Sequence, residues 1–161
     1  MEFNIKRHNL LDIINLNFNV YYPLNEFVSK NDFLSIIKKK RLTNNNFFPF
    51  PIFINISANL YNKYKTQKII KAFYKSKKVC NLIIKSFYVL DKKKVGEELF
   101  QTKDINHPGF NRFLNSGDYF IHCKIKNFNN KIMKNISFSY PSKIKSIFFK
   151  HRLKTIAGFH T

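Results

Sequence analysis

The 161-residue chain is rich in cationic side chains and poor in side chains arranged for catalysis. Catalysis needs acids, bases or nucleophiles at defined separations. The nine Asp and Glu residues show no spacing typical of a hydrolase or a metal site, and only Glu97 and Glu98 are adjacent. The four glycines stand singly, so they cannot form a phosphate-cradling loop. These observations predict a protein that is not an enzyme and needs no cofactor.

The histidines and cysteines do not have the spacing of a metal site. None of the five histidines lies at a zinc-ligand spacing from another histidine or from a cysteine. His122 directly precedes Cys123, so on a strand their side chains point to opposite faces. Cys80 and Cys123 belong to no C-x-x-C pair. We expect both to be small, buried, free thiols in a reducing compartment, and we expect no metal.

The charge of the chain favours a polyanionic partner. Lys and Arg number 29 against 9 Asp and Glu, which gives a net charge of +20, while 44% of the residues are apolar. A chain with this charge and enough apolar residues to form a core is typical of a nucleic-acid-binding protein, because Lys and Arg neutralise phosphates. No apolar run approaches the ~20 residues that span a bilayer. The composition therefore predicts RNA binding and no membrane association.

The first part of the chain is expected to be mainly helical. Leu10 to Leu16 supply the apolar face of a first helix, and a second helix begins after Asn31 as its cap and ends at Lys38–Arg41. The segment Phe47–Ile56 contains two prolines, which exclude a helix and permit an extended edge segment. We therefore expect a helical N-terminal lobe over residues 1–57.

The rest of the chain is expected to combine helices and strands. Apolar and lysine residues recur at helical spacing from Ala58 to Lys85, and Ser76 is expected to cap a new helix that begins at Lys77. A turn at Ser116–Asp118, with positive φ at Gly117, then leads into a strand that begins at Tyr119 and alternates apolar and polar residues. Ile136–Tyr140 alternates in the same way and predicts a further strand.

Two blocks resemble the RNA-binding module of the small-subunit ribosomal protein four family, in its mitochondrial form. They are HPGFNRFLNSGDYF at 107–120 and KKVCNLIIKSFYVLDKKKV at 77–95. The chain departs from the family pattern at Cys80, which takes the place of an arginine, at Ser86, which takes that of a glycine, and at Asp91-Lys92, which take that of an Asn-Gly turn. About eleven residues, 96–106, look inserted between the two blocks.

The resemblance implies an α+β protein with three parts. These are the helical lobe over 1–57, a small mixed helix-strand RNA-binding module over 58–126, and C-terminal strands with a basic tail over 127–161, one strand packing back onto the first lobe. The implied function is that of a structural component of the small mitochondrial ribosomal subunit that binds small-subunit rRNA early in assembly. Its partners would be that rRNA and neighbouring ribosomal proteins, with no small-molecule substrate.

The resemblance also implies which residues contact RNA. By position these are Lys77, Lys78, Asn81 and Lys85, and on charge we add Lys75, Lys92, Lys93 and Arg112. The abundance of Phe, Lys, Asn and Ile is typical of an AT-rich gene, which fits an organelle genome, a parasite or a bacterium equally well. The resemblance to the mitochondrial form of the family implies an organelle-encoded protein of the mitochondrial matrix.

Two other functions remain open at this point. The chain could be a basic, non-catalytic subunit of an organellar membrane or respiratory complex, in which Phe47–Ile56 would dock on a membrane protein or lipid. It could also be an RNA-modifying enzyme that carries the module as an accessory, although little length is left for a catalytic domain. Co-sedimentation with the small ribosomal subunit would separate these possibilities.

Overall fold

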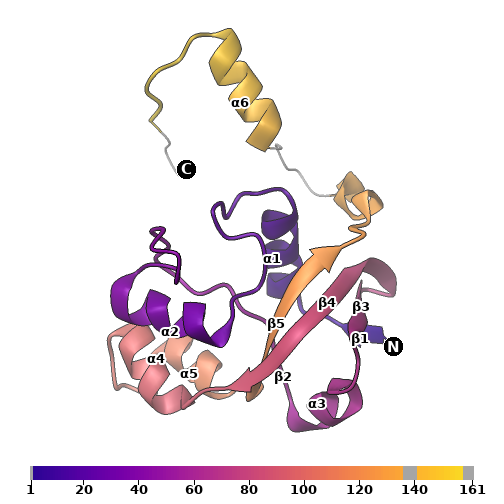
Figure 1. The fold of residues 1–161 in the computed structure, drawn as a ribbon, viewed down its shortest axis with the longest axis vertical. Coiled ribbons are helices and arrows are strands. Elements are labelled where there is room, and N and C mark those ends of the chain that lie inside the picture. Colours follow the sequence, from indigo (N-terminus) through magenta and orange to yellow (C-terminus); the bar gives the residue numbers. More distant parts are fainter. Residues whose placement is uncertain (1, 136–140, 158–161) are drawn as a thin grey trace.

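The fold is built on one five-stranded mixed sheet (Figure 1). The computed structural model describes residues 2–135 and 141–157. The strands are β1 (Glu2–Asn4), β2 (Asn55–Ile56), β3 (Ile69–Tyr74), β4 (Lys77–Val89) and β5 (Tyr119–Lys126), in the spatial order β1-β3-β4-β5-β2. β1 runs parallel to β3, and the other neighbours are antiparallel. The predicted α+β class is confirmed.

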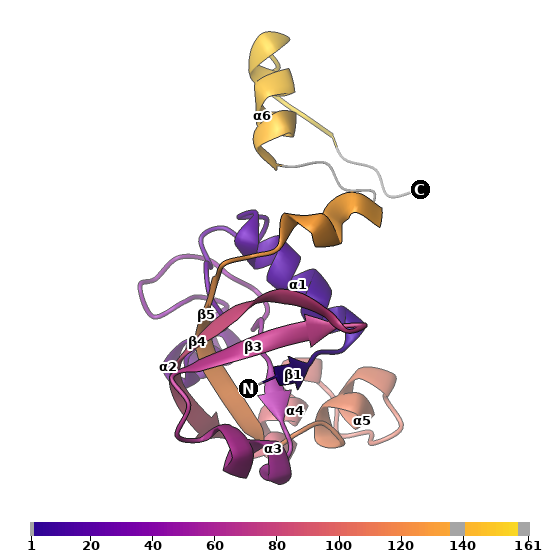
Figure 2. The same cartoon turned by 90° about the vertical axis from the view of Figure 1, so that its right-hand side faces the viewer.

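Helices surround the sheet and leave one element standing apart. They are α1 (Arg7–Asn17), α2 (Lys30–Lys39), α3 (Ala58–Tyr64), α4 (Lys92–Phe100), α5 (Pro108–Leu114), the 3-10 helix η1 (Asn130–Asn135) and α6 (Pro141–Lys150). α2, α4 and α5 gather at one end of the sheet, and α1 lies nearer the other end (Figure 1). α6 stands away from the body in both views (Figures 1 and 2).

The predicted N-terminal helices are confirmed, with one change at a cap. α1 buries Leu10, Ile13 and Ile14, which share one face of the helix. α2 is capped by Ser29 and not by Asn31: the amide of Asp32 donates to the Ser29 hydroxyl oxygen (3.1 Å), and that hydroxyl donates to the Asp32 carboxylate (2.8 Å). Lys38 and Lys39 lie in its last turn, where the helix dipole favours positive charge.

The predicted helices between Ala58 and Lys85 are wrong beyond Tyr64. Only α3 is helical, and the chain then forms the antiparallel hairpin β3–β4. The turn residues Lys75 and Ser76 both have positive φ, at 47° and 60°, as two-residue hairpin turns require. Ser76 is therefore a turn residue and not a helix cap. Buried Ile70, Ala72, Cys80 and Leu82 follow the strand period of two.

β5 confirms the predicted strand and forms the centre of the aromatic core. Phe120 is fully buried and contacts the rings of Phe33, Phe53 and Tyr88 at centroid separations of 5.3–5.6 Å. The long β4 shifts its register against β5 between Ile84 and Ser86, a bulge that lets the sheet curl. Burial of Cys80 and Cys123 confirms their predicted packing role and raises the pKa of both thiols, that of Cys80 to about 12.

The proline-interrupted segment is extended, as predicted, and ends in the edge strand β2. The carbonyl of Ile54 accepts from the amide of Ile121 (2.9 Å), and Ile54 and Ile56 are buried. Glu97 and Glu98, the adjacent carboxylates, lie in α4. The sheet takes strands from both sides of the predicted boundary at residues 57 and 58. The predicted strand Ile136–Tyr140 lies outside the described residues.

Candidate functional site

A groove lies between the amino end of α1, the segment that enters β2, and α5 with the turn after it. Its volume is about 990 Å³. β1 and α1 form one wall, residues 51–60 form a second, and α5 with residues 115–118 forms the third. In the view of Figure 2, β1 and the start of α1 lie above α5. We call it the α1–α5 groove.

Three basic side chains from two distant parts of the sequence line the α1–α5 groove. They are Lys6 and His8 at the start of α1 and Arg112 in the last turn of α5. The pKa of His8 lies below its ordinary value of 6.5, because partial burial disfavours the charged ring and because Lys6 and Arg112 repel a further positive charge. Among the described residues, Lys6 and Arg112 form no ion pair with a carboxylate. The groove is therefore electropositive.

The amino end of α1 adds backbone donors to the same wall. Lys6 occupies the cap position with extended φ and ψ, its side chain caps nothing, and the first turn contains no acid. The first hydrogen bond of the helix runs from the amide of Leu10 to the carbonyl of Lys6 (3.1 Å). Within the described chain, the amides of Arg7, His8 and Asn9 have no protein acceptor. Free amides at a helix start attract anions.

Asn9 is the buried polar residue of the groove. It is 7% exposed, it lines the groove, and its side-chain amide makes no hydrogen bond within the described residues. Its amide atoms are not among the fully buried side-chain atoms of the described residues, so they reach the space of the groove. An unpaired amide at this depth marks a position where a ligand can supply the missing partner.

Two carboxylates also line the groove, and only one of them forms an ion pair with a lysine within the described residues. Asp118 forms an ion pair with Lys92 (2.7 Å), and Lys92 also donates to the carbonyl of Ser116 (2.7 Å). Burial raises the pKa of Asp12 to about 6, against a hydrogen bond from the Tyr21 hydroxyl (3.0 Å) that lowers it. Near neutral pH, Asp12 is thus the carboxylate that opposes an anion in the groove.

The far wall is rigid because a turn is fixed to β2. The side-chain amide of Asn55 donates to the Ser116 hydroxyl oxygen and to the Gly117 carbonyl, both at 2.7 Å. Arg112 lies one helical turn before Ser116, whose hydroxyl donates to the carbonyl of Phe113 (2.6 Å). These contacts hold the turn and the end of α5 against β2.

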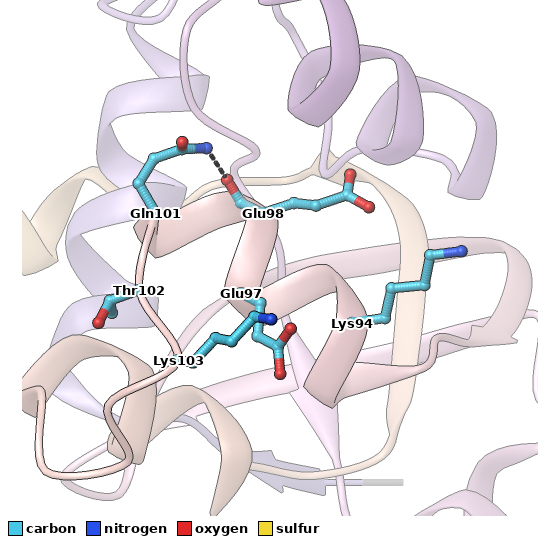
Figure 3. A pocket seen from close by; sticks show the side chains of 6 residues that line it. All are labelled: Lys94, Glu97, Glu98, Gln101, Thr102 and Lys103. Carbon is cyan, nitrogen blue, oxygen red and sulfur yellow. Dashed lines mark hydrogen bonds between the residues drawn. The ribbon is translucent and has the colours of Figure 1, made fainter.

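A second, smaller hollow lies on the outer side of α4 (Figure 3). Its volume is about 580 Å³, and its lining comes from α4 and the residues that follow it: Lys94, Glu97, Glu98, Gln101, Thr102 and Lys103. Charges of both signs line it, and the Gln101 amide donates to the carbonyl of Glu98 (2.5 Å). The lining comes from one helix and the residues after it, and its charges balance, so it does not bring groups from several elements together around a ligand. We therefore treat this hollow as a solvated helix face.

A charged cluster lies on the sheet away from the groove. Glu26 accepts from Lys85 (2.6 and 2.7 Å) and contacts His122 Nε2 (2.9 Å). Burial raises the pKa of Glu26, but the hydrogen bonds and charges of Lys85 and His122 outweigh it and hold this pKa below 4.5. No group of three His, Cys, Asp or Glu residues in the described ranges could hold a metal ion. Among the same residues, no helix is long and apolar enough to cross a membrane.

The structure does not bring the eight predicted RNA-contacting residues together. Lys75, Lys77, Lys78 and Asn81 lie on the β3–β4 hairpin, and Lys92 and Lys93 lie in α4. Lys85 and Lys92 are held by Glu26 and Asp118, while Arg112 lines the α1–α5 groove. RNA contact by these residues stays a prediction. Lys6, His8 and Asn9 were missed, because their approach to Arg112 depends on the fold and has no signal in the spacing.

The fold and the groove define a small α+β binding module. Residues 1–130 match the family model of the PUA-like domain, so the chain belongs to the PUA-like domain family. All of the groove lies within the matched residues.

Sulfate adenylyltransferases contain a stretch similar to this chain. The enzyme of Ignicoccus hospitalis is 29% identical over 110 residues, which cover 68% of this chain and 29% of the relative. The enzyme of Thermococcus onnurineus is 25% identical over 152 residues, which cover 94% of this chain and 39% of the relative. The chain thus spans well under half of the length of these relatives.

A solved structure has the same fold. It is described as a hexameric APS kinase from Thiobacillus denitrificans, and it superimposes with a TM-score of 0.64 at 9% sequence identity. The superposition covers 94% of this chain and 26% of that one.

These comparisons correct the prediction of a ribosomal protein. The chain belongs to the PUA-like domain family and not to the family of small-subunit ribosomal protein four. Its relatives are named as transferases that act on sulfate, which overturns the predicted non-enzymatic ribosomal role and the predicted partners, rRNA and ribosomal proteins without a small-molecule substrate. The similarity to sulfate adenylyltransferases also overturns the alternative of a non-catalytic subunit of a respiratory or membrane complex. The mitochondrial location stays a prediction.

Proposed function

We propose that this chain serves as the PUA-like part of a protein that transfers an adenylyl group to sulfate. The observation that carries the proposal is the similarity to sulfate adenylyltransferases, which reaches 94% of the chain in Thermococcus onnurineus and 100% of it in Carboxydothermus hydrogenoformans. The relatives are more than twice as long as the matched region. The role proposed for this part is therefore to bind and position, with the rest of such a protein completing the reaction.

Physical chemistry supports a positioning role. Sulfate and the phosphates of an adenylyl donor are all anions, and transfer at phosphorus depends mainly on alignment and on compensation of negative charge. A part with a net charge of +20 raises the local concentration of anionic reactants around itself. The electropositive α1–α5 groove lies on its surface.

A chimera tests the proposal. The 152 matched residues of the Thermococcus onnurineus enzyme are replaced by the corresponding residues of this chain, and sulfate-dependent pyrophosphate release from ATP is measured. We expect the chimera to retain adenylyl transfer to sulfate. The control is the same enzyme with an unrelated α+β domain of similar length in that place, and we expect it to be inactive.

Two results would contradict the proposal. One is a chimera that unfolds in a single thermal transition but releases no pyrophosphate above background. The other is an unrelated-domain control as active as the chimera, because the PUA-like part would then contribute nothing.

The finer predicted architecture belongs to the same proposal and stays a prediction. It comprises a helical lobe over 1–57, a mixed module over 58–126 and C-terminal strands over 127–161, one of which packs back onto the lobe. Limited proteolysis tests it, because independent lobes yield stable fragments cut near residue 57. A sheet that is continuous across this boundary favours a single resistant fragment instead.

A further inference from the structure

We propose that the α1–α5 groove binds a tetrahedral oxyanion, either free sulfate or phosphate or the phosphoryl group of a nucleotide. The proposal rests on the residues of this chain and not on the proposed transfer activity. Four features meet in the groove: free amides at the start of the eleven-residue helix α1, two cationic side chains, one of them Arg112 on the facing wall, a histidine, and the amide of the largely buried Asn9, which has no protein partner in the described residues.

The backbone supplies the geometry. The amides of Arg7, His8 and Asn9 lack protein acceptors among the described residues, and successive amides at a helix start point toward one spot. A tetrahedral oxyanion offers several oxygens that can accept from such a group of donors. A chloride ion is attracted by the same positive charges, but as a single atom it cannot offer a separate acceptor to each of the three amides.

The side chains supply charge and depth. Lys6 flanks the helix start, and Arg112 faces it from α5, so an anion between them would lie between two positive charges. Arg112 presents planar N–H donors that match two oxygens of one oxyanion. The side-chain amide of Asn9, which also lines the groove, can supply a further donor.

The groove also has apolar walls beside the basic end. Pro51, Phe53 and Phe100 line it together with the polar residues. A free oxyanion would leave these walls uncontacted, whereas a nucleotide could place its base or ribose against them. A bound nucleotide would therefore change the surroundings of Phe53 and Phe100, whereas free sulfate or phosphate would not.

The test is an NMR titration of the intact chain with sodium sulfate, followed by calorimetry. We expect saturable one-to-one binding with the largest shifts at the amides of Arg7, His8 and Asn9. Sodium chloride at equal ionic strength is the control. Equal shifts with chloride, or shifts spread over exposed lysines without saturation, would overturn the proposal, since they would show only ionic screening.

Substitutions test which side chains of the protein bind the oxyanion. Arg112→Ala should weaken sulfate binding by about tenfold or more, which is the size expected for one charge-assisted hydrogen bond. Arg152→Ala is the matched control: it removes the same side chain and the same charge from an exposed position after α6, and Arg152 does not line the groove. Equal losses in the two variants would overturn the site, because net charge would then explain the binding.

Asn9→Leu separates a ligand role from a packing role. The Asn9 amide makes no hydrogen bond within the described residues, so an apolar side chain of similar size breaks no contact there and should leave the thermal stability nearly unchanged. We expect sulfate affinity to fall at least severalfold while the thermal midpoint holds. A stable variant with unchanged affinity would remove Asn9 from the site, and unchanged affinity in Arg112→Ala as well would overturn the proposal.

A parallel titration with ADP distinguishes the two sources of the oxyanion. Shifts at the helix start alone, with affinity equal to that of sulfate, identify a free oxyanion as the ligand. Tighter binding with additional shifts at Phe53 and Phe100 identifies a nucleotide phosphate. Binding of neither probe overturns the proposal, while an active chimera would still support the proposed function.

Discussion

The backbone of Gly117 lies directly against the main chain of Ile56. A Cβ built on Gly117 would overlap the carbonyl carbon and oxygen of Ile56 and would lie 2.8 Å from its Cα. The sequence had predicted positive φ at this glycine, and that reason is wrong, because no glycine in the described ranges has positive φ. Gly117 is needed for a close approach between the turn before β5 and the edge strand β2.

Gly117→Ala should therefore destabilise the fold. The added methyl group forces either the turn or β2 to move, and overpacking of this kind costs about 1–3 kcal/mol of the free energy of unfolding. Chemical denaturation measures it. Gly109→Ala is the matched control, because its Cβ would meet the Phe100 ring at 2.7 Å, and a side chain can rotate where a backbone cannot. A smaller loss for Gly117→Ala than for Gly109→Ala would contradict this account.

The strand β5 and the helices α1 and α2 could be predicted from the sequence, because their apolar residues follow one period clearly. The hairpin could not. Apolar residues between Ile69 and Ile84 fit both a helical face and a half-buried strand, and the residues that decide between them sit in the turn. Hairpin turns of this type favour Asn-Gly, and here Lys75-Ser76 occupies both positive-φ positions without that signal.

Replacing Lys75-Ser76 by Asn-Gly should stabilise the protein. Both positions have positive φ, which Asn and Gly adopt with less strain than Lys and Ser. We expect a gain of about 1 kcal/mol in the free energy of unfolding, measured by urea denaturation. The double variant Lys75→Ala with Ser76→Ala removes the same side chains without relieving the strain and should not stabilise. A gain in the alanine variant alone would assign the effect to the lysine charge.

The α1–α5 groove was harder to predict than the elements that form it. Arg112 was singled out on its charge, but Lys6 and His8 lie more than a hundred residues away in the sequence. The parallel pairing of β1 with β3 positions the segment that carries Lys6 and His8, and the anchoring of Ser116 and Gly117 on β2 positions the end of α5 that carries Arg112. No local pattern encodes that proximity.

Glu26→Gln should lower stability near pH 7 and have little effect in acid. Glu26 is 20% exposed and accepts from Lys85 and His122, which lower its pKa below 4.5 in the folded state. A depressed pKa means that the carboxylate stabilises the fold above the unfolded value and that this contribution is lost as the pH falls through the folded value. The expected loss near neutral pH is about 1 kcal/mol or less, since Lys85 is 46% exposed.

Denaturant midpoints near pH 7 and about pH 3 measure the Glu26 effect. Glu97→Gln is the control, because Glu97 forms no ion pair within the described chain. A Glu26→Gln penalty that is equally large at both pH values would show that the side chain acts through packing and not through its charge.

Asp12→Asn should have the opposite effect on stability. Burial raises the pKa of Asp12 from 3.8 to about 6, so the folded state resists its ionisation. Stability is therefore lost as the pH rises from the unfolded pKa through the folded one, and the loss is complete above about 6. The asparagine carbonyl can still accept from the Tyr21 hydroxyl. We expect a higher thermal midpoint near pH 7, a negligible change near pH 3, and no change in the exposed control Glu2→Gln.

The same variant should change the pH dependence of oxyanion binding. The groove holds Lys6, His8 and Asp12 from α1, Arg112 from α5, and Asp118 paired with Lys92. As the pH falls through about 6, Asp12 loses its negative charge. The lowered pKa of His8 means that its ring gains a positive charge at a lower pH than an ordinary histidine does. Sulfate affinity of the wild-type chain should therefore rise in this range. Asp12→Asn should bind sulfate more tightly near pH 7 and should keep only the part of the rise that is due to His8, as calorimetry at several pH values would measure. An affinity that does not change with pH in the wild-type chain would show that neither group faces the bound anion.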